Sequence, residues 1–150
     1  MLPYMERFMA HAVDEGIKAG EQDEVPIGCV IVLNEEIIAR AHNQTIQQNS
    51  PVAHAEMIAL EQAAKHTGDW RLNHCDLFVT VEPCLMCFGA IQLARIRSLY
   101  YGVNNTQTGA WSGPNPIEEK KLKTHIFRGI LEDQIEKIMK DFFERKRRGG

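Results

Sequence analysis

The segment "HAEMIALEQAAK" at positions 54–65 decides how the middle of the chain folds. It is rich in residues with high helix propensity and Gly68 follows it as a stop signal, so the pattern predicts a helix over residues 53–66. His54 and Glu56 fall in the first turn, although neither side chain is needed to form a helix. Their position therefore points to a chemical role.

A second segment, "VEPCLMC" at positions 81–87, places two cysteines at the start of another helix. Pro83 presets the backbone for the first turn, and Cys84 and Cys87 are three residues apart, on one side of that turn. The partial positive charge at a helix N-terminus favours the thiolate, which is the form that binds metal. Alone, the pair fits a metal site about as well as a redox dithiol, with an incidental pair as a third interpretation.

His54 favours the metal site over the other two interpretations. It begins a different helix, and the strand-to-helix turns of an α/β sheet gather helix N-termini at one edge, where ligands bind. We therefore expect His54, Cys84 and Cys87 to converge as three zinc ligands. Three protein ligands with a water in the fourth position is the catalytic arrangement, whereas a structural site uses four. The isolated histidines His42, His66 and His74 are interpreted as surface groups.

Glu56 lies two residues beyond one of these expected ligands. A carboxylate there can accept the proton that zinc-bound water releases near neutral pH and can deliver it to a substrate. The alternative is that Glu56 only complements the helix dipole, which contributes a few tenths of a kcal/mol. Beside a His–Cys–Cys set, the proton-shuttle role is the favoured interpretation.

The remaining hydrophobic pattern predicts an α/β domain with helices on both faces of a sheet. The turn "NEE" joins the first two strands as a hairpin, and a loop rich in Gly, Pro, Asn and Thr covers residues 104–116. Strands are predicted at 27–33, 37–43, 75–81 and 98–103, and helices at about 4–19, 53–66, 85–95 and 131–148.

Length and composition bound the class of protein. The 150 residues suit one domain, spanning 1–150, and 44% hydrophobic and 25% charged residues are typical of a globular chain. No apolar run approaches the roughly 20 residues of a membrane span, and the N-terminus reads as an amphipathic helix, so a cytoplasmic protein is expected. Cys29 and Cys75 stand alone in strand-like runs and are interpreted as buried hydrophobic residues.

The charge is unevenly distributed over a chain whose formal net charge is −3. Basic residues gather in "EEKKLK", which contains Lys120 and Lys121, and at the C-terminal end of the last predicted helix, with Arg145, Lys146, Arg147 and Arg148. A terminal basic block often only complements the helix dipole and faces solvent. Contact with nucleic-acid phosphates is the alternative function of this block.

Several segments together carry a resemblance to a known family: "EVPIGCVIV", "RAHN", "AHAEMIAL", "TVEPCLMCFGAI", "TGA" and "DFFERKRR". They resemble the zinc-dependent cytidine/deoxycytidylate deaminase superfamily, and within it the bacterial tRNA adenosine deaminases, which convert wobble adenosine to inosine. The resemblance implies a three-layer α/β/α fold with a central mixed sheet of about five strands. It also implies one Zn²⁺ per chain, held by His54, Cys84 and Cys87 with a water or hydroxide as fourth ligand, and catalysis by Glu56.

The same resemblance implies how the substrate is bound. Asn43 is expected to hydrogen-bond the target base, and backbone N–H groups around Val81–Cys84 to contact the substrate, which puts Val81, Glu82 and Pro83 in the binding site. The implied assembly is a homodimer that binds a tRNA anticodon stem-loop, with the basic block 145–148 contacting phosphates.

The chain departs from the family pattern after the fourth predicted strand. Where the bacterial tRNA enzymes usually have an acidic residue and a lysine, "GVNNTQTG" has Asn105 and Gln107. Asn105 can still hydrogen-bond a ribose hydroxyl and is kept as a substrate-binding candidate. Two other functions stay open: a guanine or cytidine deaminase acting on free bases or nucleosides, and a non-catalytic zinc-containing RNA-binding subunit. The shuttle glutamate is expected to be missing from the last of these.

Overall fold

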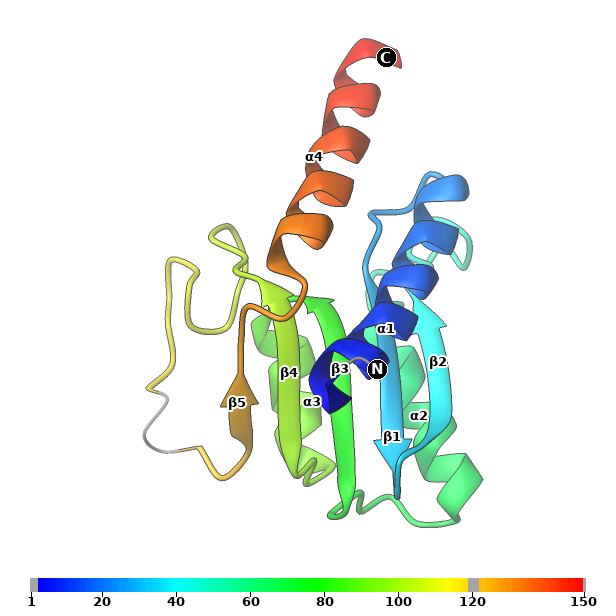
Figure 1. Ribbon diagram of the computed structural model, residues 1–150, viewed down its shortest axis with the longest axis vertical. Coiled ribbons are helices and arrows are strands. Elements are labelled where there is room, and N and C mark those ends of the chain that lie inside the picture. Colours follow the sequence, from blue (N-terminus) through cyan, green and yellow to red (C-terminus); the bar gives the residue numbers. More distant parts are fainter. Residues whose placement is uncertain (1–2, 119–121, 150) are drawn as a thin grey trace.

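Five strands form one mixed sheet in the order β2-β1-β3-β4-β5 (Figure 1). The computed structural model describes residues 3–118 and 122–149, so Lys120 and Lys121 lie outside the described residues. Only β1 is antiparallel to its neighbours, while β3, β4 and β5 are parallel. The carboxyl ends of β2, β3 and β4 therefore share one edge of the sheet. The strands are β1 (Gly28–Leu33), β2 (Glu36–His42), β3 (Cys75–Val81), β4 (Ser98–Val103) and β5 (His125–Phe127).

Two helices cover each face of this sheet. Figure 1 shows α1 (Tyr4–Glu21) and α4 (Glu132–Gly149) on the near face, and α2 (Ala55–Thr67) and α3 (Leu85–Leu93) behind it. The predicted three-layer α/β/α fold with about five strands is thereby confirmed. No helix among the described residues combines the length and apolar character needed to cross a bilayer.

The core is divided into two layers because successive strand side chains point to opposite faces. In β3, Leu77 and Val79 pack in the cluster beneath α2 and α3, whereas Phe78 packs in the cluster beneath α1. Cys29 and Cys75 are unpaired and buried in the first of these clusters, as predicted.

Several element boundaries differ from the predicted ones. α2 begins at Ala55 because the backbone of His54, the N-cap residue, is extended. α3 ends at Leu93, two residues before the predicted end, and Arg95 takes a positive φ of 64°. The hairpin turn is as predicted, with positive φ at Asn34 and Glu35. The sequence pattern did not predict β5, because this strand has only three residues and none of them is buried.

Candidate active site

Two helix N-termini meet at the edge of the sheet where β2 and β3 end. His54 is the N-cap residue of α2, Cys84 is the N-cap residue of α3, and Cys87 follows in the first turn of α3. Neither N-cap side chain bonds its own helix. The Nδ1 atom of His54 lies 3.7 Å from the Sγ of Cys84 and 3.4 Å from the Sγ of Cys87. The three donor atoms all lie within 4.8 Å of one another.

These separations fit a zinc ion. Bond lengths of about 2.3 Å to sulfur and 2.0–2.1 Å to nitrogen, at tetrahedral angles, place ligand atoms about 3.5–3.8 Å apart. The measured 3.4 and 3.7 Å lie close to that range, before any ion draws the side chains into place. Within residues 3–118 and 122–149, no other His, Cys or carboxylate joins this group. The described residues therefore bring together three side chains that could hold a metal ion.

The electrostatics of the two thiols favour metal binding. Hydrogen bonds from Cys87 and from His54 outweigh burial and lower the pKa of the Cys84 thiol to about 4. The same bond to Cys84, burial and the nearby Glu56 carboxylate raise the pKa of Cys87. Hydrogen bonding to Cys84 also raises the pKa of His54. The lowered pKa of Cys84 favours the thiolate, which is the form that binds a metal ion.

Glu56 lies beside the ligands but is not one of them. Its side chain is almost fully buried, with 4% of the residue exposed. Burial raises the pKa of its carboxyl to about 7, although its own backbone N–H and the Cys87 thiol both hydrogen-bond to it. A carboxyl with this pKa can both accept and release a proton near neutral pH.

Asn43 ties the strand β2 to the start of α2. Its Oδ1 accepts a hydrogen bond of 2.9 Å from the N–H of Ala55, and its own backbone N–H donates to Ile27 at 3.1 Å. The loop between Asn43 and His54 closes through a bond from Gln44 N–H to the Ala53 carbonyl. Asn43 therefore caps α2 with its oxygen, so the side-chain Nδ2 is the group left to act on a ligand.

The segment Val81–Pro83 uses part of its backbone within the sheet and toward the loop that follows β4. Val81 belongs to β3 and pairs with Val103, and the N–H of Glu82 donates to the Val103 carbonyl at 2.9 Å. Pro83 has no N–H, and its carbonyl accepts from Ala110. A substrate contact by the Glu82 N–H would require this sheet bond to be exchanged, and it stays a prediction.

Asn105 is engaged within its own loop. Its Oδ1 accepts from the N–H groups of Gln107 and Thr108, and its Nδ2 donates to the Thr108 hydroxyl at 2.8 Å. Asn105 thus stabilises a turn, while the exposed Gln107 lies at the tip of that turn. A ribose contact by Asn105 would require these bonds to be exchanged.

The basic block divides into two parts at the end of α4. Arg145 donates to the Gly20 carbonyl at 3.3 Å, and Lys146 lies 3.3 Å from Asp23, so both hold α4 to the end of α1. Arg147 and Arg148 are exposed, and no described residue forms a salt bridge with either. Only the second pair is free to meet a phosphate without breaking a contact.

Two buried carboxylates near the site had no signal in the residue pattern. Glu24 accepts from the N–H groups of Ile46 and Gln47 and holds the loop that leads to His54. Glu82 accepts from three N–H groups of the loop after β4.

Zinc-dependent deaminases combine these features: one histidine and two cysteines as ligands, with a nearby glutamate that is not a ligand. Comparison with known proteins agrees with that class. The chain belongs to the family defined by the cytidine and deoxycytidylate deaminase zinc-binding region, whose model matches residues 3–103. His54, Glu56, Cys84 and Cys87 all lie within the matched region.

Curated relatives extend over nearly the whole chain. The tRNA-specific adenosine deaminase of Streptococcus pyogenes serotype M18 is 43% identical over 93% of this chain and 90% of its own length. The tRNA-specific adenosine deaminase of Bacillus subtilis is 40% identical over 95% of this chain and 91% of its own.

Solved structures share the fold. One, from a study of A-to-I editing by tRNA:A34 deaminases at the wobble position, has a TM-score of 0.79 at 40% identity, covering 88% of this chain and 98% of its own. The guanine deaminase of Bacillus subtilis has a TM-score of 0.65 at 37% identity, covering 67% of this chain and 65% of its own.

Proposed function

We propose that this protein is a hydrolytic deaminase that converts adenosine to inosine at the wobble position of tRNA. The observation that carries the proposal is the likeness to tRNA-specific adenosine deaminases over 93% and 95% of the chain. The site geometry supports the same chemistry, because three ligands leave room for a water and Glu56 lies beside them.

His54, Cys84 and Cys87 would hold the zinc ion. Zinc supplies a water whose pKa is lowered toward 7, so that a nucleophile is available at neutral pH. Glu56 takes the proton of the attacking water at its carboxylate and returns it to the departing amino group. The C6–N bond of adenine breaks, a C6–O bond forms, and ammonia leaves. Asn43 holds the base by donating from Nδ2 while its oxygen keeps α2 in place.

The decisive assay compares three substrates with the zinc-loaded protein. An anticodon stem-loop with wobble adenosine is incubated beside free guanine and cytidine, and inosine and ammonia are measured. Inosine from the stem-loop is expected. Ammonia from a free base alone would reject the proposal and favour the second candidate, a guanine deaminase, which the 37% identity to the Bacillus subtilis enzyme supports.

The role of Glu56 has its own test. Glu56→Ala is expected to keep about one zinc per chain and to lose deamination, since the proton carrier is removed while the ligands stay. Glu61→Ala, an exposed position on the same helix, is the matched control and should keep both. Loss of zinc from Glu56→Ala would show instead that Glu56 is structural. The same experiment addresses the non-catalytic alternative.

The finer parts of the proposal concern RNA contacts. The exposed Arg147 and Arg148 are proposed to contact phosphates of the anticodon stem, in a cytoplasmic enzyme that acts as a single domain. Replacing both with Gln should weaken stem-loop binding and flatten its dependence on salt concentration, because fewer counterions are released. Unchanged binding and salt slope would remove the block from the interface.

A homodimer is proposed from apolar side chains around the ligands. Leu85 and Met86, between the two cysteines, are 47% and 36% exposed, and Ile46 and Val52 in the loop before His54 are 64% and 51% exposed. Exposed apolar groups of this size mark interaction sites. We propose that a second copy of the chain packs against these four side chains. Light scattering on the zinc-loaded protein tests it: the mass of two chains is expected, and the mass of one would reject it.

A further inference from the structure

Glu82 is a buried carboxylate that lies two residues before the ligand Cys84, and it contacts no other charged group among the described residues. Only 2% of the residue is exposed. Its Oε1 accepts from the N–H of Asn105 at 3.0 Å, and its Oε2 accepts from the N–H groups of Trp111 and Ser112 at 3.0 and 2.9 Å. All three donors belong to the loop that follows β4. Three N–H donors thus satisfy the oxygens of this buried side chain.

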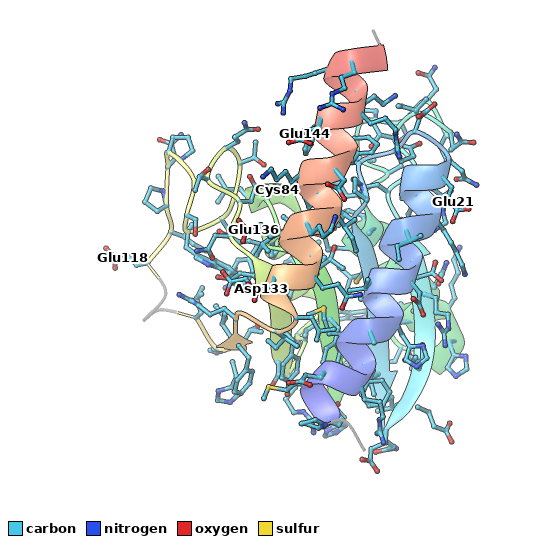
Figure 2. All side chains as sticks on the ribbon, turned by 45° about the horizontal axis from the view of Figure 1, so that its top comes forward. Glu21, Cys84, Glu118, Asp133, Glu136 and Glu144 are labelled. Carbon is cyan, nitrogen blue, oxygen red and sulfur yellow. The ribbon has the colours of Figure 1, made fainter. Side chains whose placement is uncertain are left out.

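This loop runs directly beside the metal ligands. Gly109 forms a β-bridge with Cys84, and the N–H of Ala110 donates to the Pro83 carbonyl at 2.9 Å. The ring of Trp111 packs edge-on against Phe88, the residue after Cys87, with centroids 5.2 Å apart. Figure 2 shows Cys84 next to this loop. The loop is thus one wall of the space around the metal site.

The loop has little regular structure of its own, so its backbone N–H groups cannot all pair with a neighbouring strand. The carboxylate of Glu82 accepts from three of them instead. The N–H groups at residues 105, 111 and 112 would otherwise lack an acceptor on the protein. The fit is close at Gly109, where an added Cβ would collide with the Asn105 carbonyl oxygen and with the Glu82 carboxylate. The conformation of the loop therefore depends on both the acceptor oxygens of Glu82 and a glycine at 109.

We propose that Glu82 is a positioning residue, which sets the wall formed by residues 105–112 against Pro83 and Cys84 so that the substrate meets a preorganised cleft. Its effect on catalysis rests on the proposed function, but its effect on the loop does not. It acts through the loop, since both of its carboxylate oxygens accept from backbone N–H groups of that loop. A purely structural role would instead only change how much enzyme is folded.

Hydrogen exchange in the unaltered protein gives the first test. The amides of Asn105, Trp111 and Ser112 are expected to exchange at least about tenfold more slowly than that of the exposed Thr106, because their bonds to the buried Glu82 side chain must open first. Exchange of all four at similar rates would overturn the proposal without any variant. This test also stands if the protein proves inactive on tRNA, so failure of the function and failure of the positioning role are distinguishable.

Glu82→Gln gives the second test, with Glu36→Gln at an exposed hairpin position as the matched control. The amide turns an N–H₂ group toward backbone donors, so faster exchange is expected at residues 105, 111 and 112. Zinc content should stay at that of the unaltered protein. Activity on the stem-loop should fall about tenfold or more in kcat/KM, with KM rising, as for other residues that support a metal site from outside its ligand set.

The split between KM and kcat separates positioning from stability. If Glu82 only stabilised the fold, the zinc-loaded fraction would fall and KM would stay unchanged. That outcome would overturn the proposal, as would unaltered exchange in the loop. Glu36→Gln should change none of these quantities.

A second variant approaches the same contact from the loop. Gly109→Ala should reproduce faster loop exchange and a raised KM, whereas Gly89→Ala, whose Cβ meets nothing within 4 Å, should not. Because both changes disrupt one contact, the combined variant should lose little more than the stronger single one. Fully additive losses would show that Glu82 and Gly109 act separately and would overturn the shared role.

Discussion

Asn43 is predicted to perform two tasks with the two ends of one side chain. Its Oδ1 caps α2 by accepting from Ala55 N–H at 2.9 Å, and its Nδ2 is assigned to the base. Asn43→Asp keeps the acceptor and removes the donor, whereas Asn43→Ala removes both. Comparing the two substitutions therefore separates the structural task from the functional one.

The magnitudes follow from the geometry. Asn43 is 9% exposed, so the Ala55 N–H loses its partner in Asn43→Ala with little access to water. Loss of such a cap costs about 1 kcal/mol, within a range of about 0.5–2. For a domain of this size, that lowers Tm by about 2–4 °C. Asn43→Asp should change Tm by less than about 1 °C, because a carboxylate also caps helices well.

Activity should depend on the Nδ2 group of Asn43 rather than on its oxygen. Both substitutions are expected to lower kcat/KM on the stem-loop by about tenfold or more, since the base loses a hydrogen bond and, with Asp, meets an acceptor instead. Thermal unfolding is followed by circular dichroism at saturating zinc, beside initial rates of inosine formation. The exposed Asn73→Ala serves as the control and should change neither quantity.

Two results would refute this reasoning. If Asn43→Asp melted together with Asn43→Ala, the cap would not depend on the side-chain oxygen. If Asn43→Asp kept full activity, the Nδ2 group would have no part in holding the base.

Three further predictions concern the metal, the pH dependence and the anchoring of α1. Cys84→Ala should lose zinc and unfold at a lower temperature, and the unaltered protein should do the same when a chelator is added. Cys75→Ala should keep its zinc. Full zinc content in Cys84→Ala would remove that residue from the ligand set. Burial opposes ionisation of Glu15, but hydrogen bonds from Lys18 and His42 outweigh it and hold the pKa of its carboxyl below the usual 4.5. The stability that Glu15 contributes is therefore complete above about pH 4.5 and is lost as the pH falls through the lowered pKa, so urea unfolding should show the gap to Glu15→Gln closing in acid; a gap that widens in acid contradicts this. Asp76→Asn should lower the free energy of unfolding in urea by about 2–3 kcal/mol, because buried Asp76 accepts from the Tyr4 hydroxyl at 2.6 Å and from two nitrogens of Arg97. Asp14→Asn at an exposed site should cost almost nothing. Equal costs would show that the bonds of Asp76 do not anchor α1.

The sequence predicted the fold well where burial and periodicity coincide. The strand at 75–81 was predicted with its observed ends because all seven residues are buried, and the amphipathic helix near the C-terminus was predicted to within a residue at either end. The elements that the sequence predicted poorly are short or locally irregular. β5 has three residues and no buried position, so its pairing with β4 rather than its composition makes it a strand.

The metal cluster could be inferred because its chemistry is concentrated in a few residue types with fixed spacing. What joins His54 to Cys84 is the topology: β2 and β3 run in the same direction on either side of β1, which brings their following loops to one edge. The sequence could not show how the supporting loops are held. The resemblance placed Glu82 in the substrate site through its backbone, whereas its side chain accepts from backbone groups more than twenty residues away along the chain.

Oxygen labelling is the most direct test of whether this protein deaminates a wobble adenosine by hydrolysis. The zinc-loaded protein is incubated in ¹⁸O-enriched water with an anticodon stem-loop that carries adenosine at the wobble position, and the nucleosides are analysed by mass spectrometry. We predict that the wobble adenosine becomes inosine with one heavy oxygen at C6 and that one ammonia is released for each. An unchanged wobble adenosine under conditions in which free guanine is consumed would contradict the account.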